Sequence, residues 1–154
     1  FRTLTHEEFV TLRQYFSTEH RKPFKTKKQA SEMDIVNYGE LTFDMVSDCI
    51  KGMNITPYDH FVELGSGRGK CCLQIFLMTP ISSVLGIEID PMRSNVAVNT
   101  MKNLMNLHRD EKLYLNFLSS RDCRFKVADI LECNEDLNKA TIIYTCSWCK
   151  EWQT

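Results

Sequence analysis

The 154-residue sequence lacks any uninterrupted apolar run that approaches about 18 residues, so it contains no candidate transmembrane helix. It also lacks an excess of charge, because 19 lysines and arginines are balanced by 20 aspartates and glutamates, and the net charge of −1 favours no class of partner. No signal peptide is visible, but the chain begins at Phe1 rather than at a methionine. We therefore expect a fragment or trimmed chain whose targeting signals could have been lost. With 43% hydrophobic and 25% charged residues, the composition indicates one ordinary globular domain.

The seven cysteines do not have the pattern of a disulfide framework. They are odd in number, Cys71 and Cys72 are adjacent, and most of the others fall within expected strands and helices. This pattern indicates a reducing, intracellular compartment. Cys146-x-x-Cys149 has redox or metal spacing, but a single pair with four scattered histidines lacks the other half of a zinc site. The sequence therefore predicts buried thiols and no metal site.

Apolar periodicity and turn residues divide the chain into helices and strands. Thr5-x-x-Glu8 is a capping-box pattern that begins an expected amphipathic helix, and Thr42 can cap a second one. Short apolar runs between turn residues predict four buried strands. The expected helices are 6–16, 42–53, 70–78 and 91–118, and the expected strands are 60–64, 83–89, 124–130 and 141–147. This order predicts a mainly parallel α/β sheet with covering helices that stops after its fourth strand, with a ligand beyond the carboxyl ends near the first strand.

A basic arm precedes this sheet in the sequence. The segment RKPFKTKK carries five positive charges in eight positions, at Arg21, Lys22, Lys25, Lys27 and Lys28. Such a run favours a solvated surface first, and the functional alternative is an electrostatic contact to nucleic-acid phosphate or to an acidic histone surface.

The segment FVELGSGRGK places three alternating glycines between an expected strand and an expected helix. Glycine lets a backbone turn sharply and approach a ligand closely. A dinucleotide-binding pattern would require a glycine where Lys70 stands. A P-loop would require a glycine at Leu64 and a serine or threonine at Cys71. Neither phosphate-binding pattern fits this loop.

An acid two residues before alternating glycines resembles the loop of class I S-adenosylmethionine-dependent methyltransferases. The amino-acid end of that cofactor carries an ammonium, which suits Glu63, and a carboxylate, which suits exposed backbone N–H groups. Glu88 follows Glu63 by 25 residues, at the end of the second strand, where such folds place an acid for both ribose hydroxyls. Asp129 and Ile130 follow the third strand, where they can meet the adenine amino group and ring.

The run YGELTFDMV (38–46), followed by the glycine loop and Glu88, resembles the disruptor-of-telomeric-silencing family. These are class I, non-SET lysine methyltransferases of histone H3, with Y-G-E-[TS] before a Phe-Asp helix, then F-V-D-L-G-S-G, and D-[FI]-L after the third strand. The resemblance covers about residues 35–145. It implies a Rossmann-like fold, S-adenosylmethionine as cofactor, a nuclear location and a protein substrate such as a histone or nucleosome.

The resemblance also assigns roles to individual residues. The implied cofactor-binding residues are Tyr38, Gly39, Glu40 and Leu41 in a loop folded over the cofactor; Phe61, Glu63, Gly65, Ser66, Gly67, Gly69 and Lys70 in and before the glycine loop; and Glu88, Asp129 and Ile130. The implied substrate channel is Cys146, Ser147 and Trp148, where the family has Asn-Asn-Phe, so that an amide is absent and an aromatic is kept. Two further departures are Glu63 in place of an aspartate and Lys70 in place of a neutral polar residue. No catalytic acid or base is assigned, because proximity and orientation carry most of the rate of methyl transfer to an amine.

The sequence thus predicts an N-terminal helix and basic arm over 1–37, and over 38–154 a cofactor-binding methyltransferase domain without its C-terminal part. Two alternatives stay open. The chain could be a class I methyltransferase of another substrate, or a catalytically inactive module that binds a cofactor or partner. A continuation with a fifth strand and a closing hairpin would favour an enzyme.

Overall fold

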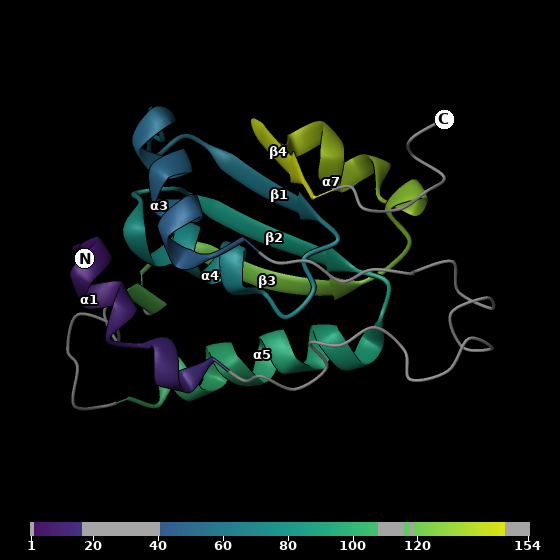
Figure 1. Cartoon of the computed structure of the whole chain (residues 1–154). Helices are drawn as coiled ribbons and strands as arrows, with labels where there is room; N and C mark the ends of the chain where they lie inside the picture. Colours follow the sequence, from purple (N-terminus) through teal and green to yellow (C-terminus); the bar gives the residue numbers. More distant parts are fainter. Residues whose placement is uncertain (1, 17–40, 108–115, 118, 147–154) are drawn as a thin grey trace.

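The computed structural model describes residues 2–16, 41–107, 116–117 and 119–146. A sheet of four parallel strands lies at its centre, in the order β3-β2-β1-β4 (Figure 1). The strands are β1 (His60–Leu64), β2 (Ser83–Glu88), β3 (Asp122–Val127) and β4 (Ile142–Thr145). The predicted parallel α/β sheet is confirmed.

Helices lie on both faces of this sheet. The helical elements are α1 (His6–Val10), η1 (Arg13–Tyr15), α3 (Phe43–Gly52), α4 (Lys70–Met78), α5 (Pro91–Met105), η2 (Ile130–Glu132) and α7 (Asn134–Lys139). Because side chains alternate along a strand, Phe61 of β1 points into a large core with α1, α3 and α4, while Val62 points into a smaller core beside η2 and α7. α5 runs along β3 on the side of the large core (Figure 1).

The N-terminal helix is shorter than the predicted 6–16. The capping box of Thr5 and Glu8 is present as predicted, but the α-helix ends at Val10 and a 3₁₀ turn follows. The hydroxyl of Thr11 donates to the Glu8 carbonyl at 2.6 Å and the Leu12 N–H donates to Phe9 at 2.9 Å. A threonine hydroxyl competes for helix carbonyls in this way, so the last turn tightens instead of extending.

Two other predicted elements end earlier than expected, and one helix was not predicted. α5 ends at Met105 and not at 118, because the Leu107 N–H closes a tight turn on the Leu104 carbonyl at 3.2 Å. β3 ends at Val127, so residues 128–130 leave the sheet before η2 begins. The helix α7 was not predicted, since its five polar residues around Leu137 carry no apolar periodicity.

Candidate functional site

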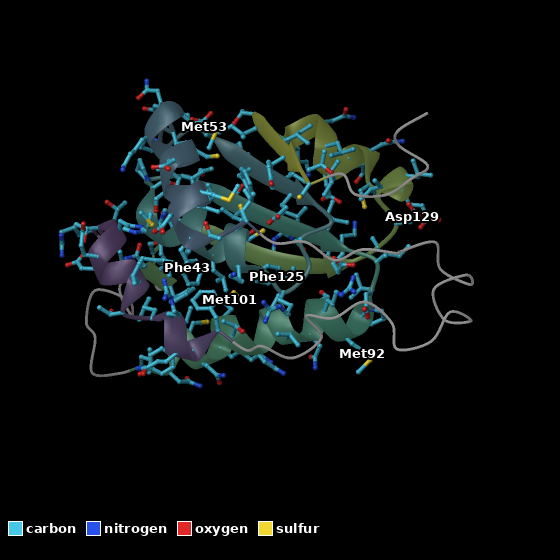
Figure 2. All side chains as sticks on the ribbon, viewed as in Figure 1. Phe43, Met53, Met92, Met101, Phe125 and Asp129 are labelled. Atoms are coloured by element: carbon cyan, nitrogen blue, oxygen red, sulfur yellow. The ribbon has the colours of Figure 1, made fainter. Side chains whose placement is uncertain are left out.

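The glycine loop lies at the carboxyl ends of the strands, between β1 and α4. Within the sheet, β2 and β3 lie to one side of β1 and β4 lies to the other. The strand order therefore reverses at β1. Ligands of open α/β sheets bind beside this point of reversal. Asp129 lies at the same end of the sheet, beyond β3 (Figure 2).

Left-handed backbone shapes the loop. Gly65, Gly67 and Gly69 have φ angles of 77°, 54° and 76°, a region in which a side chain is strained. The N–H groups of Gly65 and Ser66 both donate to the Ile87 carbonyl, at 2.8 and 2.9 Å. These bonds attach the loop to the end of β2, and the alternation of glycines follows from this conformation.

The Glu88 carboxylate accepts hydrogen bonds from the backbone of the glycine loop and of Asp90. Glu88 is 5% exposed; its Oε2 accepts the Gly67 N–H at 2.7 Å and its Oε1 accepts the Asp90 N–H at 3.0 Å. An ionised carboxylate offers about four acceptor positions, so each oxygen keeps a lone pair for a hydroxyl of a ligand. The predicted ribose acceptor is therefore held rigidly, beside the loop, by two backbone donors.

Glu63 is buried at the other end of the loop. Its side chain is 6% exposed and its residue pairs with Tyr144 of β4 in the sheet register. The thiol of Cys72 donates to Glu63 Oε2 at 3.0 Å. Burial raises the pKa of Cys71, Cys72 and Tyr144, and the charge of Glu63 raises each pKa further. Glu63 therefore lies among groups that stay protonated and neutral at physiological pH.

Space beside the loop fits a ligand. A Cβ added at Gly65 would meet no heavy atom of the described residues within 4 Å, so the side of the loop at Gly65 is open. The hydroxyl of Ser66, by contrast, lies against Gly86 beneath the loop, where a Cβ on Gly86 would be 2.7 Å from it. This buried hydroxyl has no hydrogen-bond partner among the described residues. The open side and the acceptors of Glu88 together suit a polar ligand that lies along the loop.

The remaining candidate residues lie in varied surroundings. Phe61 is buried in the large core, and Leu41 packs against the same core. The Lys70 ammonium lies 4.8 Å from the ring centroid of Phe43, so it contacts α3. Asp129 caps η2, because its Oδ1 accepts the Leu131 N–H at 2.9 Å.

Ile130 packs against the smaller core and Cys146 follows β4 at the carboxyl edge. The other predicted positions lie outside the residues that the structure describes: Tyr38, Gly39, Glu40, Ser147, Trp148 and the basic arm at Arg21, Lys22, Lys25, Lys27 and Lys28.

Two contributors to the site were not predicted from the sequence. The Asp90 N–H and the Cys72 thiol hold the two acids, yet neither belongs to the motif. Cys72 lies nine residues after Glu63, and its position on the inner side of the first turn of α4 was the one available signal. Within the described part of the chain no group of three His, Cys, Asp or Glu residues is placed to hold a metal. No helix in that part is long and apolar enough to cross a membrane.

Residues 18–139, which make up most of the chain, match the family described as "Histone methylation protein DOT1". The chain belongs to this family. The resemblance drawn from the tyrosine-glycine-glutamate segment and the glycine loop is thereby confirmed.

One sequence relative and one solved structure are similar to this chain. The chain is 25% identical over 111 residues to the histone-lysine N-methyltransferase, H3 lysine-79 specific, of Drosophila melanogaster. That match covers 70% of this chain but 6% of the length of the fly protein. An RNA methyltransferase from Salinibacter ruber, crystallised with S-adenosyl-L-homocysteine, has a TM-score of 0.50 at 20% identity over 70% of this chain and 60% of its own. The second likeness supports the class I methyltransferase fold.

Proposed function

We propose that this DOT1-family chain contains the cofactor-binding half of an S-adenosylmethionine-dependent protein-lysine methyltransferase. The observation that carries the proposal is the carboxylate of Glu88, which closes the glycine loop through Gly67 and keeps acceptor positions on both oxygens. An acid so placed at the end of β2 accepts the two ribose hydroxyls of an adenosine cofactor. A nicotinamide cofactor would call for the G-x-G-x-x-G spacing that Lys70 interrupts.

Each part of the cofactor has a partner in this proposal. Glu63 binds the ammonium of the amino-acid end, and the open side of the loop at Gly65 receives the carboxylate. Asp129 and Ile130 contact adenine, with Asp129 using the oxygen that does not cap η2. When bound, the cofactor supplies an electrophilic methyl group on a sulfonium. In this proposal Glu63, Glu88 and Asp129 would hold the cofactor at the carboxyl ends of the strands.

The substrate side is proposed from the family alone. Cys146, Ser147 and Trp148 line a channel for a lysine side chain, and Tyr38, Gly39 and Glu40 fold over the cofactor. The channel must exclude water from a neutral lysine amine and align it with the methyl group, because alignment accounts for most of the rate. The aromatic ring of Trp148 then stabilises the methylated, cationic product.

The proposed substrate is a histone, since the family and its Drosophila member are named for histone methylation. A nuclear location follows from that substrate. We further propose that the basic arm contacts nucleosomal DNA or an acidic histone surface through its five positive charges.

Titration calorimetry with S-adenosylhomocysteine tests cofactor binding. Glu88→Ala removes two charge-assisted hydrogen bonds to ribose, so we expect affinity to fall by about 100-fold. Glu7→Gln is the matched control, because Glu7 is an exposed glutamate of α1, far from the loop in the sequence. We expect Glu7→Gln to bind S-adenosylhomocysteine as tightly as the unmodified protein does.

A ribose-modified ligand separates lost ribose contacts from a collapsed loop. Glu88→Ala also removes the acceptor for the Gly67 N–H, and that loss alone could distort the site. The 2′,3′-dideoxy analogue of S-adenosylhomocysteine should bind the unmodified protein as weakly as Glu88→Ala binds the full ligand. Glu88→Ala should bind both ligands equally. Binding of NAD without a response to S-adenosylhomocysteine would refute the proposal.

Transfer of labelled methyl groups from S-adenosylmethionine tests the activity. The full-length protein is incubated with nucleosomes, free histones and a total tRNA fraction. Label on histone H3 supports a lysine methyltransferase, and label on RNA alone indicates another class I methyltransferase. Cofactor binding without any transfer indicates the inactive module.

A further inference from the structure

The buried contact between Cys72 and Glu63 has no counterpart in the glycine motif. The Cys72 sulfur lies 3.0 Å from Glu63 Oε2, its side chain is 0% exposed and Glu63 is 6% exposed. Glu63 lies on β1 and Cys72 lies in the first turn of α4, so the contact joins the two ends of the loop. Water therefore has little access to this pair.

The proton of the pair lies on sulfur. An ordinary thiol has a pKa about four units above that of a glutamate carboxyl. Burial raises the pKa of Cys72 well above that ordinary value, and the charge of Glu63 raises it further. The thiol consequently donates its hydrogen bond to Oε2 of Glu63.

Glu63 needs such a donor more than an aspartate would. The family resemblance places an aspartate at this position, and glutamate adds one methylene and one rotatable bond. A longer side chain has more rotamers, and every rotamer lost on binding weakens affinity. A donor that holds one carboxylate oxygen beforehand removes part of that cost.

We propose that Cys72 is a positioning residue for the cofactor's amino-acid end. Its thiol holds Oε2 of Glu63 and so limits the rotamers of the carboxylate that would bind the ammonium of the ligand. This inference rests on the proposed cofactor site, and it predicts that the effect of Cys72 is confined to ligands that carry the ammonium.

Cys72→Ser and Cys72→Ala form a matched pair that isolates the donor. The two replacements have nearly the same volume, so they leave a similar gap in the core, but serine keeps a hydroxyl that can donate to Glu63. We expect Cys72→Ala to bind S-adenosylhomocysteine about tenfold more weakly than the unmodified protein, and Cys72→Ser to recover to within about threefold. Cys123→Ala, which removes a thiol that packs against the same core from β3, should leave the affinity unchanged.

Methylthioadenosine distinguishes positioning from a general loss of structure. This ligand retains adenine, ribose and sulfur but lacks the amino-acid end. A positioning role predicts that neither replacement at Cys72 changes its affinity by more than about twofold. A distorted loop would weaken both ligands alike, and that result would overturn the inference.

Glu63→Asp supplies the second arm of the test. The aspartate carboxylate is one methylene shorter and does not reach the sulfur, so Cys72→Ala and Cys72→Ser should bind S-adenosylhomocysteine equally in this background. Equal binding by the two variants in the Glu63 background would overturn the inference and leave the cofactor site intact. Absence of binding by the unmodified protein would overturn both.

Discussion

Gly69→Ala is the strongest test of how the glycine loop is built, because Gly69 meets two constraints at once. Its φ angle is 76°, and a Cβ there would lie 2.7 Å from the Ala97 Cβ and from the Phe125 ring. Phe125 packs against the large core and Ala97 belongs to α5, so neither contact is the far end of a long, flexible side chain. The left-handed conformation costs a residue with a side chain about 1–2 kcal/mol. Crowding in a packed core adds about 1–3 kcal/mol. We therefore expect the free energy of unfolding to fall by about 2–5 kcal/mol.

Substitutions at two other glycines measure the cost of the left-handed conformation and the cost of crowding separately. Gly65 has a φ angle of 77° but open space around the added Cβ, so Gly65→Ala should cost about 1–2 kcal/mol. Gly86 lies within β2, and its Cβ would meet Ser66 at 2.7 Å and Phe125 at 2.8 Å. Gly86→Ala should therefore cost about 1–3 kcal/mol from crowding alone.

Urea unfolding followed by far-ultraviolet circular dichroism measures all three variants. Gly69→Ala should be the least stable of the three variants. If Gly69→Ala loses no more stability than Gly65→Ala, the close contact with α5 and β3 does not constrain the loop. Gly65→Ala should also weaken S-adenosylhomocysteine binding by more than its small loss of folding stability would explain. The added methyl group enters the open side of the loop, where the ligand is proposed to bind.

Three further predictions concern other parts of the chain. The Thr56 N–H and the hydroxyls of Thr141 and Thr56 lower the pKa of Asp59, so its contribution to stability is present above the ordinary value of 3.8 and is lost as pH falls through the lower, folded value. Asp59→Asn should accordingly lose less stability than the unmodified protein on acidification, and a parallel acid profile in the two proteins would contradict this. Hydrogen exchange across 36–42 should slow on addition of S-adenosylhomocysteine, whereas equal exchange with and without ligand would make the segment a structural turn. Neutralising the lysines of the basic arm should weaken nucleosome binding and flatten its dependence on the logarithm of salt concentration, and an unchanged slope would return the arm to a solvated surface.

The elements that could be predicted from the sequence are those with strong local signals. The strand 60–64, the helix 70–78 and the capped start of the helix at Pro91 agree with the structure, because apolar runs, turn residues and caps act over a few neighbouring residues. The spacing of the glycines likewise predicted the loop between β1 and α4, and Glu88 was predicted at the end of β2. The helix α7 and the end of α5 were missed, since their bounds depend on tertiary contacts and on the closing turn rather than on periodicity.

Tertiary structure alone decided how those residues meet. Sequence spacing places Glu88 at a strand end, but the parallel pairing of β1 with β2 brings its carboxylate to the Gly67 N–H. The same pairing places Ser66 over Gly86, and the packing of α4 against the sheet places the Cys72 thiol beside Glu63. These contacts join residues that are 9 to 21 positions apart in the chain. Their geometry depends on strand pairing and helix packing, which bring together residues that a local pattern of residue types does not pair.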